Sequence, residues 1–247
     1  MRRFVPITAL LVACTCGERQ ELSEPPVVVA PVGCGQAWTG QGDLAPRPVS
    51  EWERLTLEEA ARGLGMSPEC ENRVREGAYT VWSCEWSGDE WGFSVDLMEF
   101  DNPEDASWAV KDPYPGEVFV QEDSFVLQIE ARNGACGEQL LEGVLSETRP
   151  ETQNDQSVRS ALEARGWGVE ECTMESFDGT HSIDCTAFRG QDHAVQFDVA
   201  WSGDGAGERR KTEREDGLAW WWYVSGESTA IVHDGVAARA LATLMVP

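Results

Sequence analysis

The sequence has few basic side chains. Its 247 residues include 19 lysines and arginines against 44 aspartates and glutamates, which gives a formal net charge of -25. A protein with this charge repels the phosphates of nucleic acids, because nonspecific binding to them depends on neutralisation by cations. We therefore expect no DNA or RNA partner.

Long apolar runs are missing after the first fourteen residues. A helix that spans a bilayer needs about 20 consecutive apolar residues, so the body of the protein is not expected to cross a membrane. Hydrophobic residues still make up 41% of the chain. That share is enough for a packed core that needs no metal.

Common catalytic motifs are absent as well. The chain contains no GxSxG nucleophile elbow, no phosphate-binding loop of the GxxxxGKS type and no HExxH zinc motif. It also lacks the close CxxC pairs and the short histidine spacing of zinc sites. We therefore expect no metal, no cofactor and no enzymatic activity.

The leader is typical of export. Two arginines precede an apolar run from Phe4 to Ala13, which is too short for a membrane span and has the composition of a cleaved signal peptide. The sequence Leu11-Val12-Ala13-Cys14 resembles the lipobox of bacterial lipoproteins. The resemblance implies that residues 1–13 are removed and that Cys14, acylated on its sulfur and its amine, becomes the first residue. An ordinary secretory leader is the alternative.

A lipid anchor places the protein in the bacterial cell envelope. Thr15 follows Cys14 where aspartate would retain an enterobacterial lipoprotein at the inner membrane, so the outer membrane is favoured. Residues 14–54 contain two proline clusters, and an extended proline-rich chain spans about 3.1 Å per residue. We expect this tether to hold the folded body away from the bilayer, on the periplasmic or the surface face.

Two segments of the body resemble each other. Ala61-Arg62-Gly63-Leu64-Gly65 returns at residues 164–168 as Ala-Arg-Gly-Trp-Gly, and each copy continues with two cysteines and then an alternating apolar and polar stretch. Each copy ends with a turn signal and a helix of small residues. The sequence therefore predicts an α+β fold made of two tandem repeats, residues 55–145 and 157–247. The polar residues 146–156 form the linker.

Each repeat is expected to be an antiparallel sheet with helices on one face. The alternating stretches Phe93–Leu97 and Val195–Val199 have the period of half-buried strands. Asp96 and Asp198 occupy matching places on the polar side of these strands, where we expect a solvated face.

The eight cysteines predict disulfides, because an exported chain meets an oxidising compartment. Two bridges follow from matching positions in the repeats, and a third joins the two cysteines of the body and tether that have no counterpart. The expected pairs are Cys70 with Cys84, Cys172 with Cys185, and Cys34 with Cys136. Cys16 is left without a partner.

The 11 tryptophans are the most unusual feature of the composition. Side chains in the run Trp220 to Tyr223 would point alternately to the two faces of a strand, so one pair has to leave the local core. Burial against the other repeat and an aromatic binding surface are the two interpretations. The candidates for an exposed binding surface are Trp86, Trp91, Trp221 and Tyr223.

The three histidines all lie in the second repeat. His193 aligns with Trp91 and His233 aligns with Arg132, so neither belongs to a shared catalytic plan. His193 beside Asp192 could act as a general base, and a surface pair on a hairpin is the simpler interpretation.

These features favour a lipid-anchored extracytoplasmic binding protein without catalytic activity, whose partner is another protein. Two alternatives from other classes are retained. One is a cell-surface hydrolase that uses carboxylates and His193, and the other is an effector or immunity lipoprotein exchanged between cells.

Replacing Cys14 with serine is expected to release the protein from membranes or to block its processing, because the thiol is the group that takes the diacylglycerol. Membrane fractionation and sequencing of the mature amino terminus measure the two effects. A mature terminus that lies beyond Cys16 would contradict the lipid anchor.

Overall fold

A computed structural model describes residues 38, 40, 42, 44–71, 73–111, 113–147, 154–202, 209–213, 219–223 and 226–247. The side chains are not described for residues 147, 201, 202, 209–213, 219–223, 226 and 227, for which the structure gives the backbone alone. The predicted leader and lipidation site at Cys14, together with Cys16 and Cys34, lie outside the described residues.

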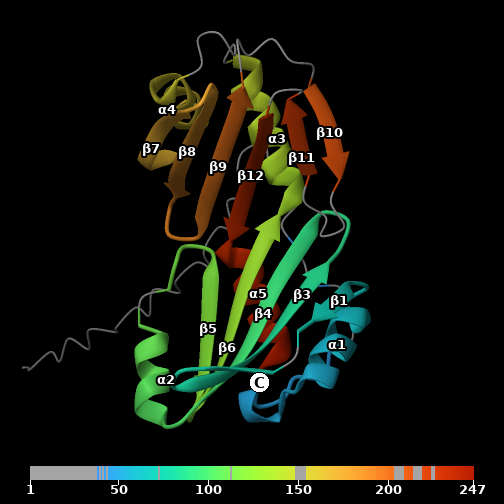
Figure 1. The fold of residues 1–247 in the computed structure, drawn as a ribbon. Helices are drawn as coiled ribbons and strands as arrows, with labels where there is room; N and C mark the ends of the chain where they lie inside the picture. The colour runs from blue at the N-terminus through green and yellow to red at the C-terminus, as the bar shows by residue number, and fades with distance from the viewer. Residues whose placement is uncertain are drawn as a thin grey trace, which may run out of the picture.

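The first half of the chain is rich in strands, which lie in the lower part of Figure 1. Its elements are η1 (Val49–Glu51), α1 (Arg54–Gly63), β1 (Ser67–Cys70), β2 (Val74–Glu76), β3 (Tyr79–Ser87), β4 (Trp91–Phe100), α2 (Pro103–Ala109), β5 (Glu117–Glu122), β6 (Phe125–Asn133) and α3 (Gly134–Glu147).

The second half follows a closely similar order, and its strands lie in the upper part of Figure 1. Its elements are α4 (Asp155–Glu163), β7 (Gly168–Phe177), β8 (Thr180–Arg189), β9 (His193–Ser202), β10 (Arg209–Glu213), β11 (Ala219–Tyr223), β12 (Gly226–Asp234) and α5 (Gly235–Met245). No helix in the described part of either half is both long enough and apolar enough to cross a membrane.

The strands confirm the predicted α+β class and its antiparallel pairing, but they form one sheet where the sequence predicts one sheet for each half. The 12-stranded sheet has the order β1-β3-β4-β6-β12-β9-β8-β7, with the remaining strands at its side. The halves meet where Arg132 of β6 pairs with His233 of β12. Each of these two strand ends already pairs with a strand on one side, and this pairing supplies a partner on the other side.

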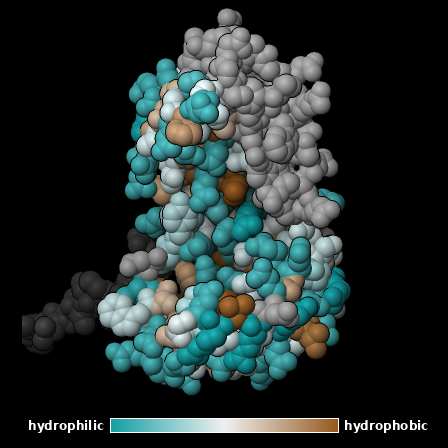
Figure 2. Space-filling view, viewed as in Figure 1, coloured by the Kyte–Doolittle hydropathy of each residue, from teal (hydrophilic) through white to brown (hydrophobic). Residues whose placement is uncertain are grey.

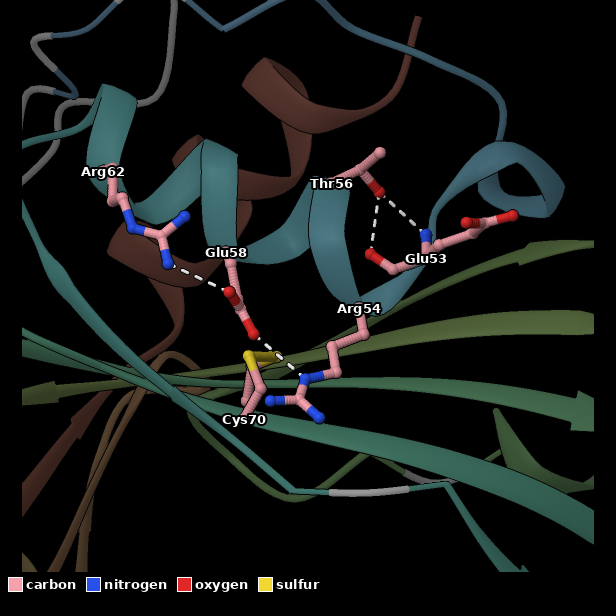
Figure 3. Close-up of a disulfide and its surroundings, with 7 residues drawn as sticks. Glu53, Arg54, Thr56, Glu58, Arg62 and Cys70 are labelled. Carbon is pink, nitrogen blue, oxygen red and sulfur yellow. Dashed lines mark hydrogen bonds and ion pairs between the residues drawn. A yellow bond between two sulfur atoms is a disulfide. The ribbon is translucent and has the colours of Figure 1, made fainter.

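Local sequence determines where several helices begin, and Figure 3 shows the start of α1. At α1 the hydroxyl of Thr56 accepts a hydrogen bond from the backbone N–H of Glu53 and donates one to its carbonyl. Asn154 and Ser157 form the same kind of capping box at α4. On the surface of α1, Glu58 lies between Arg54 and Arg62 at helical spacing and pairs with both.

Two disulfides fasten the strands that follow α1 and α4. Cys70 of β1 is bonded to Cys84 of β3, and Cys172 of β7 is bonded to Cys185 of β8. These are the two pairs that the matching spacing predicts, and a loop of this length contributes about 3 kcal/mol on the chain-entropy model. Cys136 is also disulfide-bonded. Its pairing with Cys34 stays a prediction, because Cys34 lies outside the described part.

The described part of the chain has two main apolar cores, and the last helix of each half belongs to the core of the other half. We call residues 44–133 and 235–247 lobe 1, and residues 134–234 lobe 2. The lobe 1 core joins α1, β3, β4 and β6 to the buried residues of α5. The lobe 2 core joins α4, β8, β9 and β12 to the buried residues of α3.

The helices pack in the other half because each of them starts directly at the end of a strand. Strand β6 ends at Asn133 and α3 begins at Gly134, and β12 and α5 are joined in the same direct way at Asp234 and Gly235. Because no loop intervenes, each helix continues past the β6–β12 pairing into the neighbouring lobe. Figure 1 accordingly shows α3 behind the upper strands and α5 behind the lower ones.

The packing of α3 on β12 depends on a glycine. A Cβ atom added at Gly137 would overlap the carbonyl oxygen of Ala230 on β12. The missing side chain therefore lets the helix backbone approach the strand backbone closely. Gly143, further along the same helix, differs because an added Cβ would meet only the end of the Arg165 side chain, 2.7 Å from its Nε.

We expect Gly137→Ala to destabilise the protein by about 1–3 kcal/mol, because the clash with Ala230 outweighs the higher helix propensity of alanine. Thermal or urea unfolding measures the change. Gly143→Ala is the matched control, since it offers the same gain in propensity and meets only a flexible side chain. Equal stability of the two variants would show that α3 does not pack closely on β12.

Candidate functional site

Within the described part of the chain, the helices leave most of one face of the sheet uncovered. Helices α1, α3, α4 and α5 pack on the face that holds the two main cores. On the opposite face, α2 covers only one end, where Ala106 packs with Met98, Phe100 and Val126. We call this second side the open face. Figure 2 views it directly and shows that its described surface is mainly hydrophilic.

An ion cluster occupies the centre of the open face, where the lobes meet. Nδ1 of His233 lies 2.9 Å from Oε1 of Glu130. The Nε atom of Arg132 donates to the same Oε1 at 2.8 Å, and its Nη1 contacts Oε2 of Glu85 at 3.3 Å. His233 is only 6% exposed. The cluster therefore joins β12 of lobe 2 to β6 and β3 of lobe 1.

Its partners keep the carboxylate of Glu130 ionised. Burial alone would raise the pKa of Glu130, but the adjacent imidazole of His233 and the charge of Arg132 outweigh that effect and lower the pKa to about 2. By contrast, burial raises the pKa of the neighbouring Glu85 and Asp96, and that of Glu117 on β5.

A second carboxylate pair lies on lobe 2. Asp184 of β8 and Asp198 of β9 stand directly opposite each other in the sheet. Burial of Asp198, together with the hydrogen bond and the charge of Asp184, raises the pKa of Asp198 to about 7. The hydroxyl of Thr229 donates to Oδ2 of Asp198 at 3.3 Å. The carboxyl group of Asp198 therefore holds its proton up to near neutral pH.

The solvated face expected around Asp96 and Asp198 is thus corrected. Both residues do lie on the polar side of their strands, but neighbouring strands shield them from water, as their raised pKa values indicate. In the centre of a wide sheet, side chains on the neighbouring strands bury a short side chain on either face. The alternating pattern of a single strand does not reveal this burial.

Aromatic side chains contact each other where the two lobes meet. The segment between α2 and β5 places Tyr114 against Phe188 of β8, with 5.9 Å between ring centroids, and against the ring of His233 at 6.2 Å. Burial raises the pKa of Tyr114, and the side chain of Gln196 on β9 partly opposes that effect. Next to it, Gly116 approaches the Cβ of His233 so closely that an added Cβ would lie 2.5 Å away.

His193 is a buried residue and not part of a surface pair on a hairpin. It is 7% exposed, and its Nε2 lies 3.5 Å from Oδ1 of Asp234. The same Oδ1 accepts hydrogen bonds from the backbone N–H groups of Val236 and Ala237 at the start of α5. His193 therefore supports the cap of a helix, while its sequence neighbour Asp192 pairs with Arg239 at 2.7 Å.

Two of the predicted binding tryptophans are buried, which corrects their assignment to an exposed surface. Trp86 is 0% exposed and Trp91 is 8% exposed, and both belong to the lobe 1 core. Strand alternation explains why: Trp86 lies two residues after the buried Cys84, and Trp91 lies two residues before the buried Phe93. The parity of each strand was sufficient to predict this.

The other two candidates are placed by their backbone alone. Trp221 and Tyr223 lie on β11, where Trp221 pairs with Ser228 and Tyr223 pairs with Gly226 of β12. Their side chains are outside the described part, so their role in binding stays a prediction. On β3, Trp82 is half-buried, and the guanidinium of Arg73 lies 4.3 Å from the centre of its ring.

A small pocket lies away from the open face, where the chain enters lobe 1. Its volume is about 170 Å³, and its lining includes Arg47, Trp52 and Glu59. The guanidinium of Arg47 lies 4.9 Å from the centre of the Trp52 ring. This stacking accounts for the position of Arg47 without a ligand.

The sequence analysis did not predict that Glu130, Arg132 and Tyr114 lie together at the junction of the lobes. The repeat alignment could have indicated the junction, because it matches Arg132 with His233, and these two residues pair between the halves. Within the described ranges no group of three or more histidine, cysteine, aspartate or glutamate side chains is arranged to hold a metal ion.

Comparisons with protein-family models, with curated proteins and with solved structures find no match for this chain. The chemistry of the open face therefore rests on its own residues. It offers half-buried acceptors and charges that can form hydrogen bonds and ion pairs with a partner over several strands.

We expect Asp198→Asn to raise the melting temperature at pH 8 and to have little effect below about pH 4. The folded protein holds the proton of Asp198 up to about pH 7, whereas an unfolded chain releases it near its usual pKa of 3.8. Stability therefore falls as the pH rises between these values, and asparagine removes that loss. Melting curves at a series of pH values measure it.

Glu130→Gln is the contrasting variant. Because the pKa of Glu130 is lowered from 4.5 to about 2, its charge stabilises the fold above pH 4.5, and this contribution is lost as the pH falls toward 2. The variant should therefore be less stable than the parent at pH 7 and approach it in acid. The same pH profile for both variants would contradict the opposite environments of the two carboxyl groups.

Proposed function

We propose that the protein is a lipid-anchored, extracytoplasmic binding protein without catalytic activity, held at the outer membrane through Cys14. The lipobox-like leader supports export and lipidation, and the two disulfides fit an oxidising compartment. The partner is another protein, because the open face is broad and not hollowed like a small-molecule pocket.

The single observation that carries the binding function is the open face itself. It crosses both lobes, it is free of helices over most of its described area, and it carries polar groups of unusual pKa at its centre and on lobe 2. Groups that are partly removed from water form stronger ion pairs and hydrogen bonds with a partner than fully hydrated groups do. The face therefore suits recognition across several strands.

We further propose that the body arose as a tandem duplication. The order of elements supports it, since α1, β3, β4, β6 and α3 correspond to α4, β8, β9, β12 and α5. The disulfides support it through their matching places, and so does the pairing of the aligned residues Arg132 and His233. A pairing between aligned residues is what an approximate twofold relation of the halves requires.

The alternative of a hydrolase rests on one feature, the Asp184–Asp198 pair, because a carboxyl group with a pKa near neutrality can act as a general acid. His193 offers less, because it is buried and its carboxylate partner caps α5. The non-catalytic proposal is therefore preferred.

Binding through the open face predicts that Thr186→Arg reduces partner capture at least about tenfold without lowering the melting temperature, because a long charged side chain disrupts the centre of an interface. Thr186 lies on β8 opposite Gln196. The protein is purified with its lipid intact, and capture from native membranes is quantified by mass spectrometry.

Thr243→Arg, on the exposed side of α5, is the matched control and should leave capture unchanged. The same assay with Trp221→Ala and Tyr223→Ala tests whether β11 belongs to the binding surface. Equal capture by the Thr186 and Thr243 variants would remove the open face as the binding site.

A further inference from the structure

We infer that the chain opens as two units, lobe 1 and lobe 2, whose boundaries lie at residues 133/134 and 234/235 and not in the linker between the sequence repeats. On this inference α3 is stabilised by, and unfolds with, the strands of the second half. Likewise α5 unfolds with the strands of the first half. The two boundaries act together as a hinge.

The apolar contacts support this division. All three buried apolar clusters of the described residues lie within one lobe each. In lobe 2, Leu141 and Val144 of α3 share a cluster with Leu162 of α4. In lobe 1, Leu241 of α5 shares a cluster with Leu57 of α1. Since burial of apolar surface provides most of the cooperativity of a fold, each lobe has its own source of stability.

The contacts between the lobes are of a different kind. They are mostly polar: the pair of Glu130 and His233, the pair of Asp192 and Arg239, and the backbone hydrogen bond from Gly235 to Asp192. The ring contact of Tyr114 with Phe188 adds one apolar element. Interfaces of this composition permit relative motion of domains, whereas large apolar interfaces prevent it.

The two boundaries have the same local structure. At the first, Asn133 accepts a hydrogen bond from the N–H of Cys136, and Gly134 N–H donates to the carbonyl of Glu90. At the second, Asp234 caps α5, and Gly235 N–H donates to the carbonyl of Asp192. A glycine therefore follows each strand at the point where the chain changes lobe. Glycine allows the backbone change that a hinge needs.

If the open face binds the partner, as the proposed function states, the relative orientation of the lobes sets the shape of the binding surface, because the open face crosses both lobes. A partner that contacts both lobes would then hold the hinge in one position.

Native-state hydrogen exchange of the full-length protein, read by mass spectrometry, tests the division. Leu141→Ala in α3 is expected to accelerate exchange in β8 and β9 by about tenfold or more and to change β3 and β4 much less. Leu241→Ala in α5 is expected to do the reverse. Leu162→Ala and Leu57→Ala, in helices that stay with their own half, calibrate the response of lobe 2 and lobe 1.

Two results would overturn the inference. One is faster exchange in β3 and β4 after Leu141→Ala, which would tie α3 to its own half of the sequence. The other is uniform acceleration of all strands by every variant, which would make the protein one cooperative unit. If Leu141→Ala prevents folding, Val144→Ala gives the same test with a smaller loss of buried volume. None of these readouts depends on a partner, so they are independent of the proposed function.

Discussion

The direct passage from strand to helix at Asn133–Gly134 and at Asp234–Gly235 is the constraint on which the rest of the structure depends. A helix that starts where a strand ends has to continue beyond the sheet pairing at that point, and here it reaches the neighbouring lobe. The apolar side of each helix is then buried by strands that are distant in the sequence. Both lobes need a helix from the other half, so the halves are held together although their direct contacts are largely polar.

The same arrangement produces the open face. Helices α3 and α5 join α1 and α4 on one side of the sheet, which leaves α2 as the one described helix on the other side. Polar residues at alternate strand positions therefore form a surface that is broad and only partly hydrated. Their charges respond differently because their partners differ: Glu130 is stabilised as an anion by two basic groups, whereas Asp198 faces a second carboxyl group. Net charge alone would not distinguish these two environments.

Burial of the aromatic residues shows how far strand patterns can be used. The alternation around Cys84 and Phe93 already placed Trp86 and Trp91 on the core side, so their assignment to an exposed surface was wrong. The opposite error concerned Asp96 and Asp198. Their side of the strand was predicted correctly, but their hydration was not, because it depends on the neighbouring strands and not on the strand that carries them.

Local patterns in the sequence determined the α+β class, the alternating strands, the helix starts and the two disulfides at matching positions, because each of these depends on residues that are close in the chain or equally spaced. Tertiary structure alone decided that the strands form one sheet, that α3 and α5 change lobes, and that His233 meets Glu130 across the junction. These features depend on which edges and apolar faces find each other in space. Many combinations satisfy the same local pattern, and only the packing of the whole chain selects one of them.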